Sequence, residues 1–208
     1  MENPKVYNPD IASILCGIGN NYYVQKNYAI AVEHYIKCLG IYQDLAIETP
    51  TYVTSQIPLY SNIYNSYNYQ KKYDLAIIYS NQKIELIQNN ENLINNYTNE
   101  LSMTYSRLAS FYIFDEKFNL SELSARKSLV VDSTQVGAKT NLAATLLFQG
   151  KYQEAEAIYL ELKNKEYAGQ DKTYGDTCLK YLAEFEKANV IPEERKLDVK
   201  KIKKLLRE

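Results

Sequence analysis

The sequence predicts an all-α fold made of stacked pairs of antiparallel helices. Apolar residues recur at helical spacing along almost the whole chain, as in the run Leu101, Tyr105, Leu108 and Tyr112. Glycine and proline are scarce, at 7 and 5 of 208 residues, so helices can continue between short turns. A segment pattern that occurs four times indicates that the helices come in pairs.

The four repeated segments share one arrangement of large and small residues. They are residues 15–39, 60–84, 105–129 and 139–163. Each has an aromatic residue at the expected turn between two helices, and a small residue three positions later. The turn aromatics are Tyr28, Tyr73, Phe118 and Tyr152, and the small residues are Ala31, Ala76, Ser121 and Ala155. Small side chains let two helix axes approach closely, so each segment predicts one packed helix pair.

This pattern resembles the tetratricopeptide repeat (TPR). The first segment carries the residue types of the family as Leu15, Ile18-Gly19, Tyr22, Tyr28, Ala31, Tyr35 and Cys38-Leu39. The resemblance covers about residues 10–165 and implies a right-handed α-solenoid of about four TPR-like helix pairs. The usual period is about 34 residues, whereas the small residues here lie 45, 45 and 34 positions apart. The chain is therefore similar to the long-helix variants of the family.

The second segment departs from the family pattern at two positions. Tyr64 stands where Gly or Ala is usual, and Ser80 stands where the second aromatic belongs. The extra residues of the long intervals are expected in longer helices around 39–53 and in the Asn-rich loop 88–100. Thr49 or Thr51 is expected to cap the following helix, with Pro50 in the turn.

Two further helices are expected to cap the end of the stack, because a terminal repeat needs a partly polar outer face. One spans 172–188, and the other begins at Pro192, a residue typical of the first helical position. The apolar stripe of the last helix is Leu197, Val199, Ile202, Leu205 and Leu206. The predicted organisation is an N-terminal tail at 1–9, TPR-like repeats at 10–165 and C-terminal capping helices at 166–208.

The composition favours a cytoplasmic protein that binds neither nucleic acid nor membranes. The net charge of -1 provides no general attraction to phosphate backbones or anionic lipid. No stretch approaches the ~20 apolar residues of a membrane span, and no apolar signal segment opens the chain. Cys16, Cys38 and Cys178 match no metal motif, so we expect free thiols in a reducing compartment.

Residues typical of catalytic or cofactor sites are few, and those present favour structural roles. The one histidine, His34, has no nucleophile motif near it. The glycine-containing run 17–21 lies inside a helical pattern and not in a phosphate-binding loop. The lysines within 200–204 are typical of a helix C-terminus, where they complement the helix dipole. The sequence therefore predicts no enzyme, no catalytic residue, no cofactor and no metal.

The first helix of each pair is expected to line a concave groove that is rich in amide side chains. Asparagine can donate to and accept from a peptide backbone at once, and Arg107 can hold a carboxylate with two hydrogen bonds. The predicted peptide-binding residues are Asn20, Tyr23, Asn62, Asn65, Tyr69, Arg107, Ser110 and Asn141.

The family resemblance adds one hypothesis about the ligand. Some members grip the C-terminal carboxylate of a peptide with two Lys, two Asn and one Arg. Asn20, Asn62 and Arg107 stand at corresponding positions, whereas Cys16 and Met103 replace the two lysines.

The resemblance implies a scaffold or adaptor that binds a protein or peptide in its groove. The alternative is a regulatory sensor of a short signalling peptide, or the TPR portion of a larger regulatory protein. Exposed apolar area at either end of the stack could also drive homodimer formation.

Overall fold

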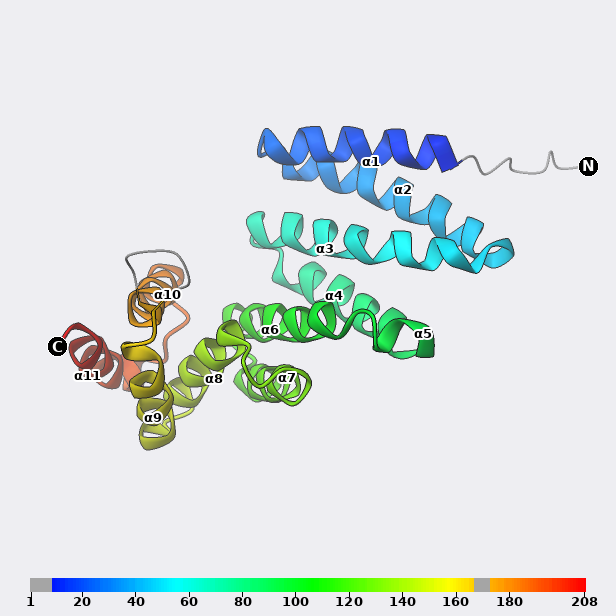
Figure 1. The fold of residues 1–208 in the computed structure, drawn as a ribbon. Coiled ribbons are helices and arrows are strands. Elements are labelled where there is room, and N and C mark those ends of the chain that lie inside the picture. The colour runs from blue at the N-terminus through cyan, green and yellow to red at the C-terminus, as the bar shows by residue number, and fades with distance from the viewer. Residues whose placement is uncertain (1–8, 167–172) are drawn as a thin grey trace, which may run out of the picture. The chain divides into compact units, whose positions relative to one another are not determined.

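The computed structural model describes residues 9–166 and 173–208. Most of the predicted tail 1–9 lies outside this range, and α1 begins at Pro9. The elements are α1 (Pro9–Val24), α2 (Tyr28–Glu48), η1 (Pro50–Tyr52), α3 (Val53–Tyr69), α4 (Tyr73–Gln88), α5 (Glu91–Ile94), α6 (Thr98–Phe114), α7 (Phe118–Val131), α8 (Val136–Phe148), α9 (Tyr152–Lys163), α10 (Tyr174–Ala188), η2 (Glu193–Arg195) and α11 (Lys196–Arg207) (Figure 1). The predicted all-α fold is confirmed, because the described residues form these helices and one isolated β-bridge.

The chain forms two compact units, residues 1–97 and 98–208. In the first unit each helix packs against the next along the chain, from α1 to α4. One cluster of its core joins α1, α2 and α3 through Ala12, Ala31, Tyr35, Cys38, Leu39, Leu59, Tyr60 and Ile63. The Asn-rich stretch 88–100 was predicted as a loop, but it contains the short helix α5 and the start of α6.

The turn inside every helix pair has the same backbone geometry. One residue in each turn adopts the left-handed conformation, at φ 61°, 59°, 55° and 82° for Lys26, Lys71, Glu116 and Gly150. The amide of the next residue donates to the carbonyl five positions earlier, as Asn27 does to Tyr22 at 2.8 Å. This hydrogen bond closes the first helix, and the aromatic residue that follows begins the second. Only the fourth turn uses glycine, the residue that adopts this conformation without strain.

Close packing inside the first pair depends on one small residue opposite one large residue. A Cβ atom on Gly19 would lie 2.7 Å from two ring carbons of Tyr35, which is fully buried. Two other pairs have Ala109 with Ala125 and Ala143 with Tyr159 at the corresponding positions. The second pair reverses the sizes, with Tyr64 on α3 and Ser80 on α4, both buried. The departure from the family pattern is therefore an exchange of large and small residues between the two helices.

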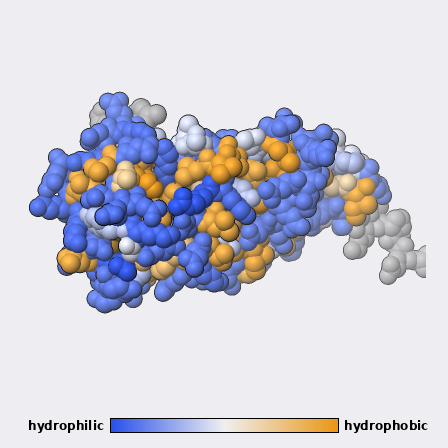
Figure 2. All heavy atoms as spheres, turned by 90° about the horizontal axis from the view of Figure 1, so that it is seen from below, coloured by the Kyte–Doolittle hydropathy of each residue, from blue (hydrophilic) through white to orange (hydrophobic). Residues whose placement is uncertain are grey.

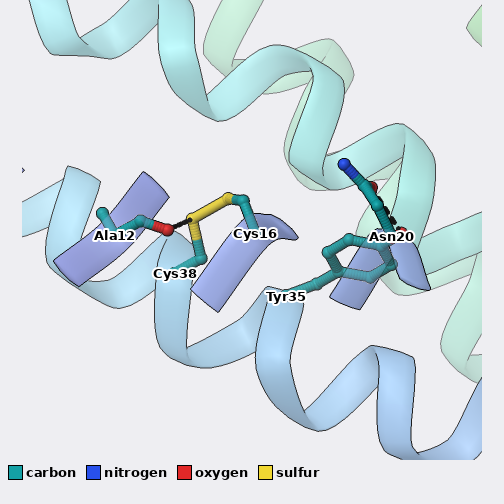
Figure 3. The surroundings of a disulfide bond; sticks show 5 residues. All are labelled: Ala12, Cys16, Asn20, Tyr35 and Cys38. Carbon is teal, nitrogen blue, oxygen red and sulfur yellow. Dashed lines mark hydrogen bonds between the residues drawn. A yellow bond between two sulfur atoms is a disulfide. The ribbon is translucent and has the colours of Figure 1, made fainter. Parts of the chain in front are cut away.

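A disulfide joins α1 to α2, and it corrects the prediction of three free thiols. Cys16 and Cys38 are bonded (Figure 3), because the packing of the two helices brings their Cα atoms to 5.8 Å. The Cys38 sulfur also lies 3.0 Å from the carbonyl oxygen of Ala12. Cys178 is the free cysteine, and it is buried in the second unit. Spacing along the sequence carried no sign of the pair, since 22 residues separate the two cysteines.

The second unit contains the third and fourth helix pairs and the two C-terminal helices. Helix α6 packs on both α7 and α8, and α9 packs on α8, α10 and α11. The large residues of its core include Leu142, Leu146, Leu147, Phe148, Tyr159, Leu162, Leu182, Phe185 and Ile202. The helices predicted for the end of the chain are therefore present, and both pack on α9.

Three local expectations for the helix ends and the last helix were wrong. Neither Thr49 nor Thr51 makes a side-chain cap to α3; Thr49 lies between α2 and η1. Pro192 precedes η2 with an extended backbone, so it does not occupy the first position of α11. Leu197 is 64% exposed, because the stripe that α11 buries consists of Val199, Ile202 and Leu206.

No helix among the described residues is long and apolar enough to cross a membrane. The face of the molecule drawn in Figure 2 is mostly hydrophilic, with separate hydrophobic patches. Lysines of the run 200–204 are engaged by acidic neighbours. Lys201 pairs with Asp198 at 3.0 Å, and Lys203 pairs with Glu186 on α10.

Substitution of Gly19 by Ala should lower the free energy of unfolding by about 1–3 kcal/mol, because the added methyl group overlaps the buried Tyr35 ring. Gly17 provides the matched control in the same helix, since nothing lies within 4 Å of a Cβ added there. Gly17→Ala should stabilise the protein by up to ~1 kcal/mol. Chemical denaturation of both variants measures the difference, and equal stabilities would contradict the packing described.

Reduction of the disulfide should lower the free energy of unfolding by about 3 kcal/mol, because the bond restricts a loop of the unfolded chain. Urea titrations with and without dithiothreitol measure this change. The double variant Cys16→Ala/Cys38→Ala should not respond to the reductant, whereas Cys178→Ala should respond as the parent does. Alkylation of all three cysteines in unfolded, unreduced protein would show that the bond is absent.

Candidate functional site

A pocket of about 140 Å³ lies in the second unit, where α6, the start of α8 and α10 meet. Its wall consists of Met103, Ser106, Arg107, Ser110, Gln135, Gly137, Asn141 and Tyr181. Most of these side chains are polar, and one of them is charged.

The shape of this pocket depends on a close approach between α6 and α8. Asn141 is buried and donates from Nδ2 to the backbone oxygen of Ser106 at 2.8 Å, which ties the two helices together. One turn earlier, a Cβ atom on Gly137 would lie 2.9 Å from the Ser106 hydroxyl. Gln135 caps α8 by accepting from the Gly137 amide. The helices that bound the pocket are therefore held together by the Asn141 hydrogen bond, and the absence of a side chain at Gly137 lets them approach closely.

Arg107 supplies the positive charge of the pocket. Its side chain is exposed, and its guanidinium group makes no hydrogen bond or ion pair with any residue that the structure describes. An unpaired guanidinium beside a hollow can bind a carboxylate with two parallel hydrogen bonds. The Ser110 hydroxyl, one helical turn away, can donate or accept beside it.

A second pocket, of about 470 Å³, adjoins the first and shares Gln135, Gly137 and Tyr181 with it. Its other lining residues are Asp132, Thr134, Val136, Thr140, Tyr174 and Thr177. Hydroxyl groups predominate in this list, and aromatic rings of α10 form part of one wall. The two pockets together make a continuous polar surface across the N-terminal end of α8.

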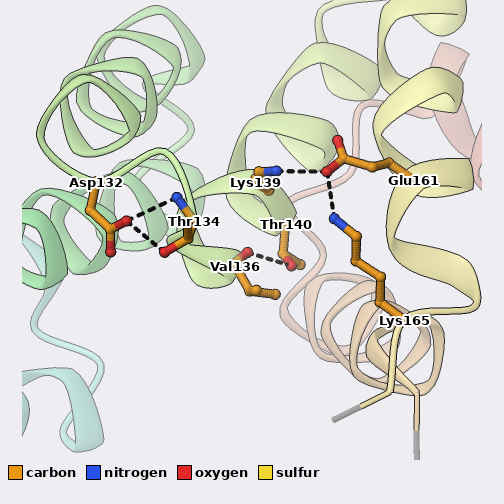
Figure 4. A network of polar contacts seen from close by, with 7 residues as sticks. All are labelled: Asp132, Thr134, Val136, Lys139, Thr140, Glu161 and Lys165. Atoms are coloured by element: carbon orange, nitrogen blue, oxygen red, sulfur yellow. Dashed lines mark hydrogen bonds and ion pairs between the residues drawn. The ribbon is translucent and has the colours of Figure 1, made fainter. Parts of the chain in front are cut away.

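The charges around the second pocket fall into two groups, shown in Figure 4. Asp132 accepts hydrogen bonds from the Thr134 hydroxyl and amide at 2.6 and 2.9 Å, and these bonds lower the pKa of its carboxyl group. Glu161 on α9 accepts from Lys139 and Lys165 at 2.6 and 2.7 Å, and these bonds lower its pKa in turn. Both nearby lysines are therefore engaged by Glu161.

The predicted groove residues of the second unit come together in one place. Arg107, Ser110 and Asn141 all line the first pocket. Asn141 differs from the expectation in one respect, because its side-chain amide already donates a hydrogen bond to the backbone oxygen of Ser106 on α6. Its carbonyl oxygen stays available for a ligand, as no described residue donates to it.

The predicted groove residues of the first unit lie on α1 and α3. Tyr23 and Tyr69 are brought together, with ring centroids 6.0 Å apart, and Tyr28 stacks on Tyr69 at 4.7 Å. Burial, followed by the neighbouring Tyr69, raises the pKa of Tyr23 to about 12. Asn20 accepts from the Tyr35 hydroxyl at 2.8 Å and turns its amide nitrogen away from that ring (Figure 3). Asn62 and Asn65 are half-buried on α3.

Several pocket residues were not predicted from the sequence. Helix α10 was expected only to cover the end of the stack, yet Tyr174, Thr177 and Tyr181 line the second pocket. Their spacing of three and four residues places them on one helix face, and this signal could have found them. Gln135 and Asp132 lie in a turn between two helices, where no periodicity marks them.

His34 packs against a neighbouring aromatic ring. Its imidazole stacks on Tyr22 with centroids 5.9 Å apart, and it lines neither of the two pockets described above. This position agrees with the packing role predicted for it.

A family model for the tetratricopeptide repeat matches residues 11–46 and 136–162. These two segments are similar to tetratricopeptide repeats. The first match spans α1 and most of α2, and the second spans α8 and α9, so the predicted family resemblance is confirmed. TPR domains generally serve as scaffolds for protein interaction.

Two similar solved structures are both crystal structures of the nearly identical TPR-like repeats of a putative kinesin light chain from Podosopora anserina. One is 11% identical, covers 96% of this chain and 94% of its own, and has a TM-score of 0.64. The other is 11% identical, covers 100% and 96%, and has a TM-score of 0.59. They confirm the predicted solenoid of TPR helix pairs. No curated protein sequence matches the chain.

Proposed function

We propose that this TPR protein is a non-enzymatic scaffold or adaptor that binds an extended polypeptide segment in the two adjoining pockets of its second unit. The observation that carries the proposal is the convergence of Arg107, Ser110 and Asn141 on one hollow. These side chains come from two helix pairs, so the stacking of repeats is what assembles the site.

The small size of the first pocket, and the second pocket beside it, favour an extended peptide over a compact small molecule. Small-molecule sites usually enclose about 300–1,000 Å³ and bury most of their ligand. The first pocket, at about 140 Å³, is below that range and suits one short side chain or a chain terminus. The second, at about 470 Å³, is within that range and also has room for a long side chain. An extended peptide places side chains in successive hollows in this way.

The chemistry of the pocket wall favours the same ligand. In an extended peptide segment outside any helix or sheet, the backbone donors and acceptors are unpaired. Hydroxyl and amide groups of the pocket wall can pair with them. The free guanidinium of Arg107 adds a site for a carboxylate, from an acidic side chain or from a peptide C-terminus. We therefore expect an acidic residue or a free C-terminus in the bound segment.

Further parts of the proposal concern location and assembly. We propose that the protein binds neither nucleic acid nor membranes, since its net charge is -1. A cytoplasmic location stays a prediction. It was based partly on an expectation of free thiols, and the Cys16–Cys38 disulfide counts against that expectation because such bonds are rare in the cytoplasm. Homodimer formation also stays a prediction; Ile14 on α1, 63% exposed, belongs to the apolar surface that it would use.

Replacement of Arg107 by Glu should weaken peptide binding at least ~10-fold, because the variant repels the carboxylate that the parent holds. The probe is a phage-displayed library of random peptides, from which enriched sequences are synthesised and measured by fluorescence polarisation. Lys200→Glu is the matched control, since Lys200 is exposed on α11 and lines neither pocket. Equal affinity for Arg107→Glu and the parent, or no enriched peptide, would contradict the proposal.

A further inference from the structure

The second pocket carries a charge opposite to that of the first. Asp132 accepts both hydrogen bonds from Thr134 at its Oδ1 atom, and Oδ2 has no partner among the described residues. The carboxylate therefore keeps one oxygen available at the edge of the pocket. Figure 4 shows this second oxygen pointing away from Thr134.

No neighbouring lysine neutralises this carboxylate. Lys139 is the cation of α8 in this region, and its ammonium group lies 2.6 Å from Glu161. Lys165 lies 2.7 Å from the same carboxylate, so both lysines form ion pairs with Glu161 on α9. Within the described part of the unit, Asp132 has no ion-pair partner.

Arg107 and Asp132 are thus two uncompensated charges of opposite sign on one continuous surface. The hollows that they line share three uncharged residues, Gln135, Gly137 and Tyr181. A ligand that spans both hollows meets a cation at one end and an anion at the other. Electrostatic complementarity of this kind sets the register and direction of a bound segment.

We propose that the two pockets bind one extended peptide segment that carries a carboxylate for Arg107 and a Lys or Arg side chain for Asp132. The inference rests on the proposed function and names the ligand chemistry of that same site. The sizes agree with this assignment, because the smaller pocket suits a short carboxylate and the larger suits a long basic side chain. The rings of Tyr174 and Tyr181 offer apolar surface for the methylene stem of that side chain.

The chemistry of Asp132 allows its charge to be removed with little change in structure. In the variant Asp132→Asn, the amide oxygen can still accept from the Thr134 hydroxyl and amide, while the negative charge is lost. Glu194→Gln removes the same charge from an exposed residue of η2 that lines neither pocket, and it serves as the matched control.

The test uses the full chain and an array of synthetic peptides on a neutral background of Ala and Ser. One set carries an acidic and a basic residue at varied spacing and in both orders. A second set carries the acidic residue alone, and each peptide is made with a free and with an amidated C-terminus to distinguish a terminal from a side-chain carboxylate. The parent should prefer acid-base peptides of one order and spacing.

Asp132→Asn should lose about 10-fold in affinity for these acid-base peptides and bind the acid-only set unchanged, as expected for one lost ion pair. The double variant Arg107→Glu/Asp132→Lys should prefer peptides with the two charges exchanged. This inference would be overturned if the parent bound both peptide sets equally, or if Asp132→Asn bound the acid-base peptides as tightly as the parent does. The proposed function would still stand if Arg107→Glu weakened binding. An affinity that is unchanged in Arg107→Glu as well would overturn both this inference and the proposed function.

Discussion

The constraint on which this fold depends is the limited volume between the two helices of each pair. Gly19 can face the buried Tyr35 ring only because it has no Cβ atom. Across the four pairs, at most one of the two corresponding positions holds a large residue. Protein interiors are packed as closely as organic crystals, so two aromatic residues at these positions would force the helices apart. The identity of each residue is therefore less important than the combined volume of the two.

The candidate site follows from the same close approach between helices. Gly137 lies against the Ser106 hydroxyl, and Asn141 donates to the Ser106 carbonyl, so α6 and α8 meet at a fixed distance. This contact places Arg107 and Gln135 on one surface, although they belong to different repeats. Because rigid helices hold the lining residues, a peptide would meet donors and charges that are already in position, and less entropy is lost when it binds.

The sequence was sufficient to predict the helix pairs and to place three residues that line the first pocket on the first helix of a pair, since these features depend on local periodicity. Arg107, Ser110 and Asn141 were found from their position on the first helix of a pair. Features that depend on tertiary contacts were missed, including the Cys16–Cys38 bond and the wall contributed by Tyr181. The shared turn geometry was also hidden, because Lys and Glu residues give no sign that they adopt a left-handed backbone. The exchange at Tyr64 and Ser80 was visible in the sequence as a departure, but its physical meaning required the packing.

A double-mutant cycle at Tyr64 and Ser80 tests the volume constraint most directly. Tyr64→Ala alone should leave a cavity and cost about 3–5 kcal/mol, and Ser80→Tyr alone should overpack the pair and cost about 1–3 kcal/mol. The double variant recreates the arrangement of the fourth pair, Ala143 with Tyr159, so its loss of unfolding free energy should be smaller than the sum by at least ~1 kcal/mol. Losses that add to within ~0.5 kcal/mol would show that the two positions do not share one space, and would contradict this explanation of the fold.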